Sequence, residues 1–251
     1  MSPKSSKKTV AKNFAETDLY PPIQKFFTEL DYQVNAEVKG CDVAMTKNGE
    51  LIIIELKKSF NLTVLYQAMD RQKLTTQVYI AVPRPKTSRD TAYRNMLQIV
   101  KKLELGLMTV AMDSPLRHVE ILAFPPVAQV KSALKKPARR ESVLKEMAGR
   151  TLDTNLGGST RRKLVTAYRE KVLHIACALE SHGAMNKNEL IALGCDAKAY
   201  NILRANQYGW FEKVSKGRYG LSAEGICALE DGNEFETLIA FYRDKAQIEK
   251  E

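Results

Sequence analysis

The sequence is poor in histidine and cysteine, and it has no long apolar run. Only three histidines occur in 251 residues, which disfavours a histidine-based metal site or catalytic triad. The four cysteines are scattered and form no C-x-x-C pair, a pattern that argues against a zinc knuckle or a disulfide framework. No run of about 18 apolar residues is present, and the basic N-terminus lacks the apolar stretch of a secretory signal. We therefore expect a cytoplasmic protein without a membrane span.

Positive charge is concentrated in two segments of the chain, whose formal net charge is +10. Residues 1–12 carry four lysines and no acid, and residues 131–169 carry 11 basic and 3 acidic side chains. The remaining segments are close to balance, with 14 basic against 13 acidic side chains in 13–130 and 10 against 13 in 170–251. Clustered positive charge favours a polyanionic partner such as nucleic acid, although a solvated linker can have the same composition.

Apolar periodicity predicts an α/β domain over residues 13–130. Helical spacing marks 19–30, 61–75 and 89–106, and strand patterns mark 32–40, 41–47, 50–56, 77–85, 107–113 and 118–124. The order α-β-β-β-α-β-α-β-β predicts a mixed sheet covered by helices.

The basic composition and weak periodicity of residues 131–160 indicate a partly ordered linker. The helical and hairpin patterns of residues 161–245 predict a second domain. Three helices, a β-hairpin turning at 215–217 and a last helix indicate a winged helix-turn-helix. Side chains suited to contact bases or phosphates fall on its expected recognition helix and wing: Lys198, Tyr200, Asn201, Arg204, Asn206, Lys213, Lys216 and Arg218. Because residues 170–251 carry 10 basic and 13 acidic side chains, protein interaction or dimerisation is the alternative role.

Charged residues are aligned by a predicted turn at Asn48-Gly49. Asn-Gly between apolar strands indicates a two-residue hairpin, in which Asp42 faces Glu55. Carboxylates in this position lie roughly 5 Å apart at Cβ and repel unless a cation or a proton intervenes. Lys57 projects from the same face, two residues beyond Glu55. The group predicts a Mg²⁺ or Mn²⁺ site, with Lys57 orienting or deprotonating a water and stabilising transition-state charge. The alternative is an ordinary ion pair at the edge of the sheet.

The layout helix, strand, GCD-V-A, hairpin, IIIELKK and helix resembles the PD-(D/E)XK nuclease superfamily, which has a restriction-endonuclease-like α-β-β-β-α-β core. The resemblance implies that Asp42 and Glu55 are the two acids of the motif and Lys57 its lysine. It further implies an additional metal-binding acid, either Glu16 or Glu37, and a catalytic glutamine, Gln67. The proline of the motif is Cys41 here, which lowers its specificity without removing a ligand.

The stretches ETDLYPP, EVKGCDVA, ELKKSFNL, QAMDRQ and YGWFEKVSKGRYGLSAEG together resemble a bacterial family of unknown function described as PD-(D/E)XK-type phosphodiesterases. The resemblance implies a metal-dependent nuclease that acts on DNA, with RNA as a further candidate substrate. Arg71, one turn after Gln67, is a candidate phosphate contact. Cutting both strands of a duplex would favour a homodimer. Two other hypotheses remain. The chain is a catalytically inactive, nuclease-like protein with a nucleic-acid-binding or regulatory role, or it is a protein-interaction adaptor.

Overall fold

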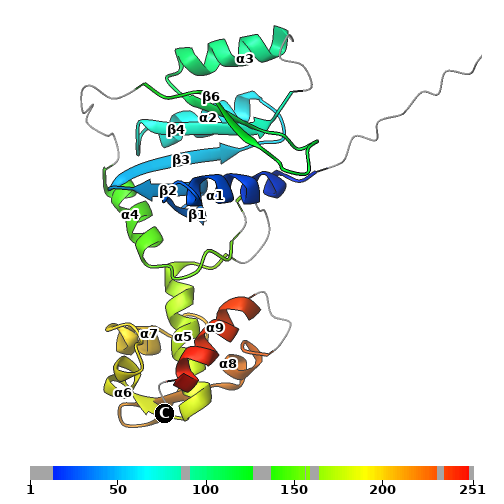
Figure 1. Ribbon diagram of the computed structural model, residues 1–251. Helices are drawn as coiled ribbons and strands as arrows, with labels where there is room; N and C mark the ends of the chain where they lie inside the picture. Colours follow the sequence, from blue (N-terminus) through cyan, green and yellow to red (C-terminus); the bar gives the residue numbers. More distant parts are fainter. Residues whose placement is uncertain are drawn as a thin grey trace, which may run out of the picture. The chain divides into compact units, whose positions relative to one another are not determined.

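The computed structural model describes residues 14–85, 91–126, 137–155, 157–158, 164–230 and 235–248 (Figure 1). Contacts divide the chain into two units. Unit 1 comprises Met1–Val143 with Leu156–Thr160, and unit 2 comprises Leu144–Asn155 with Arg161–Glu251. Each unit has a hydrophobic core of its own.

Unit 1 has the predicted order of helices and strands. The elements are η1 (Glu16–Leu19), α1 (Tyr20–Thr28), β1 (Gln33–Val38), β2 (Cys41–Lys47), β3 (Glu50–Leu56), α2 (Leu62–Arg71), β4 (Gln77–Pro83), α3 (Thr91–Lys102), β5 (Gly106–Val110) and β6 (Val119–Ala123). The six strands form one sheet in sequence order. The pairs β3–β4 and β4–β5 are parallel and the other three are antiparallel, so the sheet is mixed.

Different helices cover the two faces of this sheet (Figure 1). On one face, α1 packs through Ile23 and Phe27 in a cluster that includes Ile54 of β3. On the other face, α2 and α3 share a second cluster with β4 and β5. Because side chains alternate along a strand, Glu55 points away from Ile54, toward the face that α2 covers.

The Asn48-Gly49 hairpin forms in the predicted register. Both residues have positive φ, 52° and 79°, as a two-residue type I′ turn requires. The ladder pairs Lys47 with Glu50 and continues as far as Val43 with Ile54. This register brings the first residues of β2 beside the last residues of β3.

The boundary between the two units falls inside a helix that the sequence analysis did not predict. α4 (Pro137–Ala148) lies inside the stretch expected to be a linker, and its residues up to Val143 belong to unit 1. Val143 and Met147, one turn apart, are both buried. Two apolar anchors therefore hold a helix whose basic composition conceals its periodicity.

The remaining elements of unit 2 are α5 (Ala167–His182), β7 (Met185–Asn186), α6 (Lys187–Ala192), α7 (Ala199–Ala205), β8 (Phe211–Ser215), β9 (Arg218–Leu221), α8 (Ala223–Cys227) and α9 (Glu236–Ile248). The three strands form an antiparallel sheet in the order β7-β9-β8. Within the described parts of the chain, no helix is long and apolar enough to cross a membrane.

Candidate active site

Asp42 is held against the end of β3 by a main-chain hydrogen bond. It is the second residue of β2 and is half-buried. Its Oδ2 accepts a hydrogen bond from the backbone N–H of Leu56 at 2.9 Å. The carboxylate is thereby fixed beside the residue that follows Glu55, and its negative charge acts on Glu55. The ladder pairs β2 and β3 as far as Val43 with Ile54, and the facing pair of Asp42 and Glu55 one step further on stays a prediction.

Glu55 is a fully buried carboxylate with one oxygen bound and one left over. Its side chain has 0% exposure, and Oε1 lies 2.6 Å from Nε of Arg71. Oε2 is also buried and has no hydrogen-bond partner among the residues that the structure describes. Leaving a buried anionic oxygen unpartnered is costly, so this atom marks a position where a cation would be stabilised.

The pKa values of both acids are raised. Burial, followed by the negative charge of Asp42, raises the pKa of Glu55 to about 7 against the opposing influence of Arg71 and Lys57. Burial also raises the pKa of Asp42, and the charge of Glu16 adds to this, while the Leu56 N–H and Lys57 oppose it. A divalent cation between the two carboxylates would reverse both shifts, because it stabilises the ionised forms.

Lys57 lies just beyond β3 and reaches η1. Its Nζ donates a hydrogen bond to Oε2 of Glu16 at 3.0 Å. Burial by itself lowers the pKa of Lys57, but the Glu16 hydrogen bond and the charges of Asp42, Glu16 and Glu55 outweigh it, and the pKa is raised. Lys57 is therefore an ammonium at neutral pH. The charged form suits the predicted stabilisation of transition-state charge, and the predicted roles of Lys57 in orienting or deprotonating a water stay predictions.

Glu16 is thus placed at the site through Lys57. The other candidate acid, Glu37, is a half-buried residue of β1 with φ of +53°.

A second segment of unit 1, residues 157–158, passes close to Asp42 and Glu16. A Cβ on Gly157 would lie 2.8 Å from the backbone oxygen of Asp42, and a Cβ on Gly158 would lie 3.2 Å from Cβ of Glu16. Because glycine has no Cβ, the 157–158 backbone can approach Asp42 and Glu16 closely.

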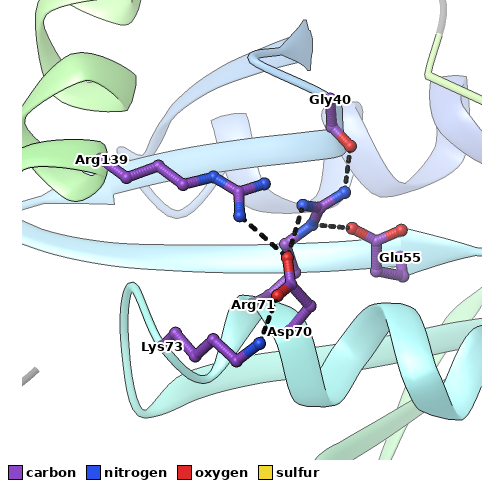
Figure 2. A network of polar contacts seen from close by, with 6 residues as sticks. All are labelled: Gly40, Glu55, Asp70, Arg71, Lys73 and Arg139. Atoms are coloured by element: carbon purple, nitrogen blue, oxygen red, sulfur yellow. Dashed lines mark hydrogen bonds and ion pairs between the residues drawn. The ribbon is translucent and has the colours of Figure 1, made fainter. Parts of the chain in front are cut away.

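Arg71 occupies a different place from the one predicted. We expected it to contact phosphate, but it is only 7% exposed and all three nitrogens of its guanidinium face groups of the chain. Nε binds Glu55, Nη2 donates to the carbonyl oxygen of Gly40, and Nη1 lies 3.6 Å from Oδ2 of Asp70 (Figure 2). A signal was present in the sequence, since Arg71 continues the inward stripe of α2 that contains Val64 and Ala68.

Gln67 lies on the same side of α2, one turn before Arg71. It is half-buried, and its Oε1 has no hydrogen-bond partner within the described segments. A second buried polar oxygen is therefore left unpaired on the helix that contacts Glu55. Its assignment as a catalytic residue stays a prediction.

Six of the eight predicted nucleic-acid contacts in unit 2 are exposed, Tyr200 and Lys213 among them, and two make contacts within the chain. Asn206 is half-buried and donates from Nδ2 to the carbonyl oxygen of Phe211 at 2.8 Å. Lys198, Asn201 and Arg204 lie at the start of α7 or along it, and Lys216 lies in the β8–β9 turn. Arg218 instead pairs with Glu189 at 2.9 Å and donates to the carbonyl oxygen of Ala184. Arg218, the first residue of β9, therefore connects the turn end of the hairpin to α6 and to Ala184.

Within the described ranges, no group of three or more His, Cys, Asp or Glu side chains is arranged to hold a metal ion. Mg²⁺ does not need such a group, because it is usually bound through one or two protein carboxylates together with waters and substrate phosphates. The carboxylate of Asp42 and the unpartnered Oε2 of Glu55 provide that smaller set. These residues fit Mg²⁺ or Mn²⁺.

The fold and the sequence comparison both agree with a PD-(D/E)XK phosphodiesterase. The α/β architecture with a mixed six-stranded sheet fits a restriction-endonuclease-like core. The model of the family described as "Putative PD-(D/E)XK phosphodiesterase (DUF2161)" matches residues 108–228, in agreement with the resemblance found in the sequence. The matched range begins in β5, so it includes most of unit 2 but not Asp42, Glu55 or Lys57. No curated protein and no solved structure matches the chain.

Proposed function

We propose that this protein is a metal-dependent phosphodiesterase that cleaves nucleic acid, DNA in the first place, at Asp42, Glu55 and Lys57. The observation that carries the proposal is the buried Oε2 of Glu55, which has no hydrogen-bond partner among the residues that the structure describes and which lies within reach of the charge of Asp42. The family description, phosphodiesterase, supports the reaction class. The proposal takes Mg²⁺ or Mn²⁺ as the cofactor.

Each side chain has a distinct task in this proposal. Asp42 and Oε2 of Glu55 would hold the cation, which supplies Lewis acidity toward the phosphate and activates a water. Lys57, kept protonated and oriented by Glu16, donates to a non-bridging phosphate oxygen and stabilises the charge that develops there. The buried strand β3 fixes Glu55, so little reorganisation accompanies the reaction.

We further propose that unit 2 is a winged helix-turn-helix that targets nucleic acid. The β7-β9-β8 sheet and the helices α5, α6 and α7 support this assignment, as do the exposed side chains of Lys198, Asn201, Arg204 and Lys216. If Arg204 and Lys216 contact phosphates, replacing either with alanine reduces the salt dependence of DNA binding by the full chain by about one ion per site.

A substrate screen tests the enzymatic proposal. The full chain is incubated with Mg²⁺ or Mn²⁺ and labelled single-stranded, duplex, nicked and branched DNA, and with RNA. Lys57→Ala is the inactive control, because it keeps both carboxylates and loses only the ammonium. Cleavage by wild type that Lys57→Ala lacks supports the proposal. Binding without cleavage of any substrate would indicate an inactive nuclease-like protein, and absence of both would indicate an adaptor.

A further inference from the structure

Arg71 connects the two strands that carry the carboxylates of the site. Gly40 immediately precedes β2, two residues before Asp42, and Glu55 is on β3. A single guanidinium binds the Gly40 carbonyl through Nη2 and the Glu55 carboxylate through Nε (Figure 2). Arg71 therefore fixes the end of the turn that leads into Asp42 relative to the side chain of Glu55.

The contact with Glu55 is specific for one carboxylate oxygen. Nε of Arg71 lies 2.6 Å from Oε1, while Oε2 has no partner among the described residues. A carboxylate held in this way cannot rotate freely, and it presents one defined oxygen. Outer partners that orient a ligand in this manner are a general feature of metal sites.

The guanidinium is itself held from its other side. Asp70 lies 3.6 Å from Nη1 of Arg71, and its carboxylate is fixed by Lys73 at 2.7 Å and by Arg139 at 2.9 Å (Figure 2). The hydrogen bond from Lys73, followed by that from Arg139, lowers the pKa of Asp70 to about 2, so Asp70 is an anion at neutral pH. Arg71 is thus clamped between two carboxylates and a carbonyl.

We propose that Arg71 is the positioning residue of the metal site, which sets the orientation of Glu55 and its spacing from Asp42 so that Oε2 is available to the cation. This inference rests on the proposed function, because it assumes that Asp42 and Glu55 bind the metal. It replaces the predicted role of Arg71 as a phosphate contact. Losing such an outer partner weakens metal binding by about 10- to 100-fold.

Mn²⁺ binding tests the inference without relying on activity. Free Mn²⁺ is measured by electron paramagnetic resonance in titrations of wild type, Arg71→Gln and Arg71→Lys, each kept below its melting temperature and checked for folding by circular dichroism. The matched control is Arg84→Gln, which removes an exposed arginine of the same unit, paired with Asp113 at 3.5 Å. A purely structural role for Arg71 would lower the melting temperature and leave the dissociation constant unchanged.

We expect Arg71→Gln to weaken Mn²⁺ binding by about 10- to 100-fold and Arg84→Gln to bind as wild type does. Arg71→Lys keeps the charge but cannot bridge Glu55 and Gly40 together, so its affinity lies between those of wild type and Arg71→Gln.

If wild type binds Mn²⁺ and Arg71→Gln binds it equally well or more tightly, the inference fails and the proposed function stands. Should Arg71→Gln not fold, Arg71→Lys decides by the same criterion. If wild type does not bind Mn²⁺, both the inference and the proposed function fail.

Discussion

The buried carboxylate of Glu55 should make the stability of the protein depend on pH in an unusual direction. Its pKa is raised from 4.5 to about 7, mainly by burial and next by the charge of Asp42. The folded state therefore holds this proton more tightly than the unfolded state. The contribution to stability is fully present below about pH 4.5 and is lost as pH rises to about 7, after which it stays constant.

The size of the effect follows from the shift. A rise of the pKa from 4.5 to about 7, at 1.36 kcal/mol for each pH unit, gives about 3 kcal/mol in total. Linkage places most of this between pH 5 and pH 8. Because Glu55 is fully buried, solvent screening does not reduce the figure greatly.

The assay is urea unfolding of wild type and Glu55→Gln with a chelator present, from pH 5 to pH 8. The glutamine has no charge to titrate, so the difference in unfolding free energy reports Glu55 together with its interaction with Asp42. We expect wild type to lose about 2–3 kcal/mol relative to Glu55→Gln as pH rises across this range. Curves that stay parallel, or a wild type that gains stability toward pH 8, would refute the reasoning.

Three further predictions concern the surroundings of the site. Asp42→Asn keeps an acceptor for the Leu56 N–H but removes the negative charge that acts on Glu55. At pH 8 we expect this variant to melt at a higher temperature than wild type in the presence of chelator, and to lose the rise in melting temperature that Mn²⁺ induces. An unchanged response of the melting temperature to Mn²⁺ would count against Asp42 as a ligand. Gly157→Ala places a Cβ 2.8 Å from the Asp42 carbonyl and should cost about 1–3 kcal/mol of stability in urea unfolding, which a variant as stable as wild type would contradict. Of the four cysteines only Cys227 is exposed, and burial raises the pKa of Cys41 and Cys177 to about 12, so a disulfide reagent should modify one thiol of the native protein and none in Cys227→Ser.

The hairpin that carries the site could be predicted because its signals are local. Asn48-Gly49 specifies the turn, and the apolar run before Glu55 specifies a strand with both faces covered, so the register follows from counting. The same reasoning placed Lys57 beyond the strand. Its partner Glu16 came only from a resemblance, because no local rule connects residues 41 positions apart.

Other features could not be read in this way because they depend on tertiary contacts. Arg71 looked like a surface residue until α2 placed it against Glu55, where a buried anion compensates its charge. Arg218 has the chemistry of a phosphate contact, yet Glu189 of α6 engages it. The helix α4 depends on Val143 and Met147, two apolar residues in a charged stretch that shows little periodicity.

The central claim is that Asp42 and Glu55 together hold a divalent cation, and anomalous diffraction from crystals grown with Mn²⁺ tests it most directly. We predict an anomalous peak beside the carboxylates of Asp42 and Glu55, with Arg71 still bound to Oε1 of Glu55. The peak should be absent in Asp42→Asn. Saturating Mn²⁺ that leaves no peak between these carboxylates, or a peak that persists in Asp42→Asn, would contradict the account.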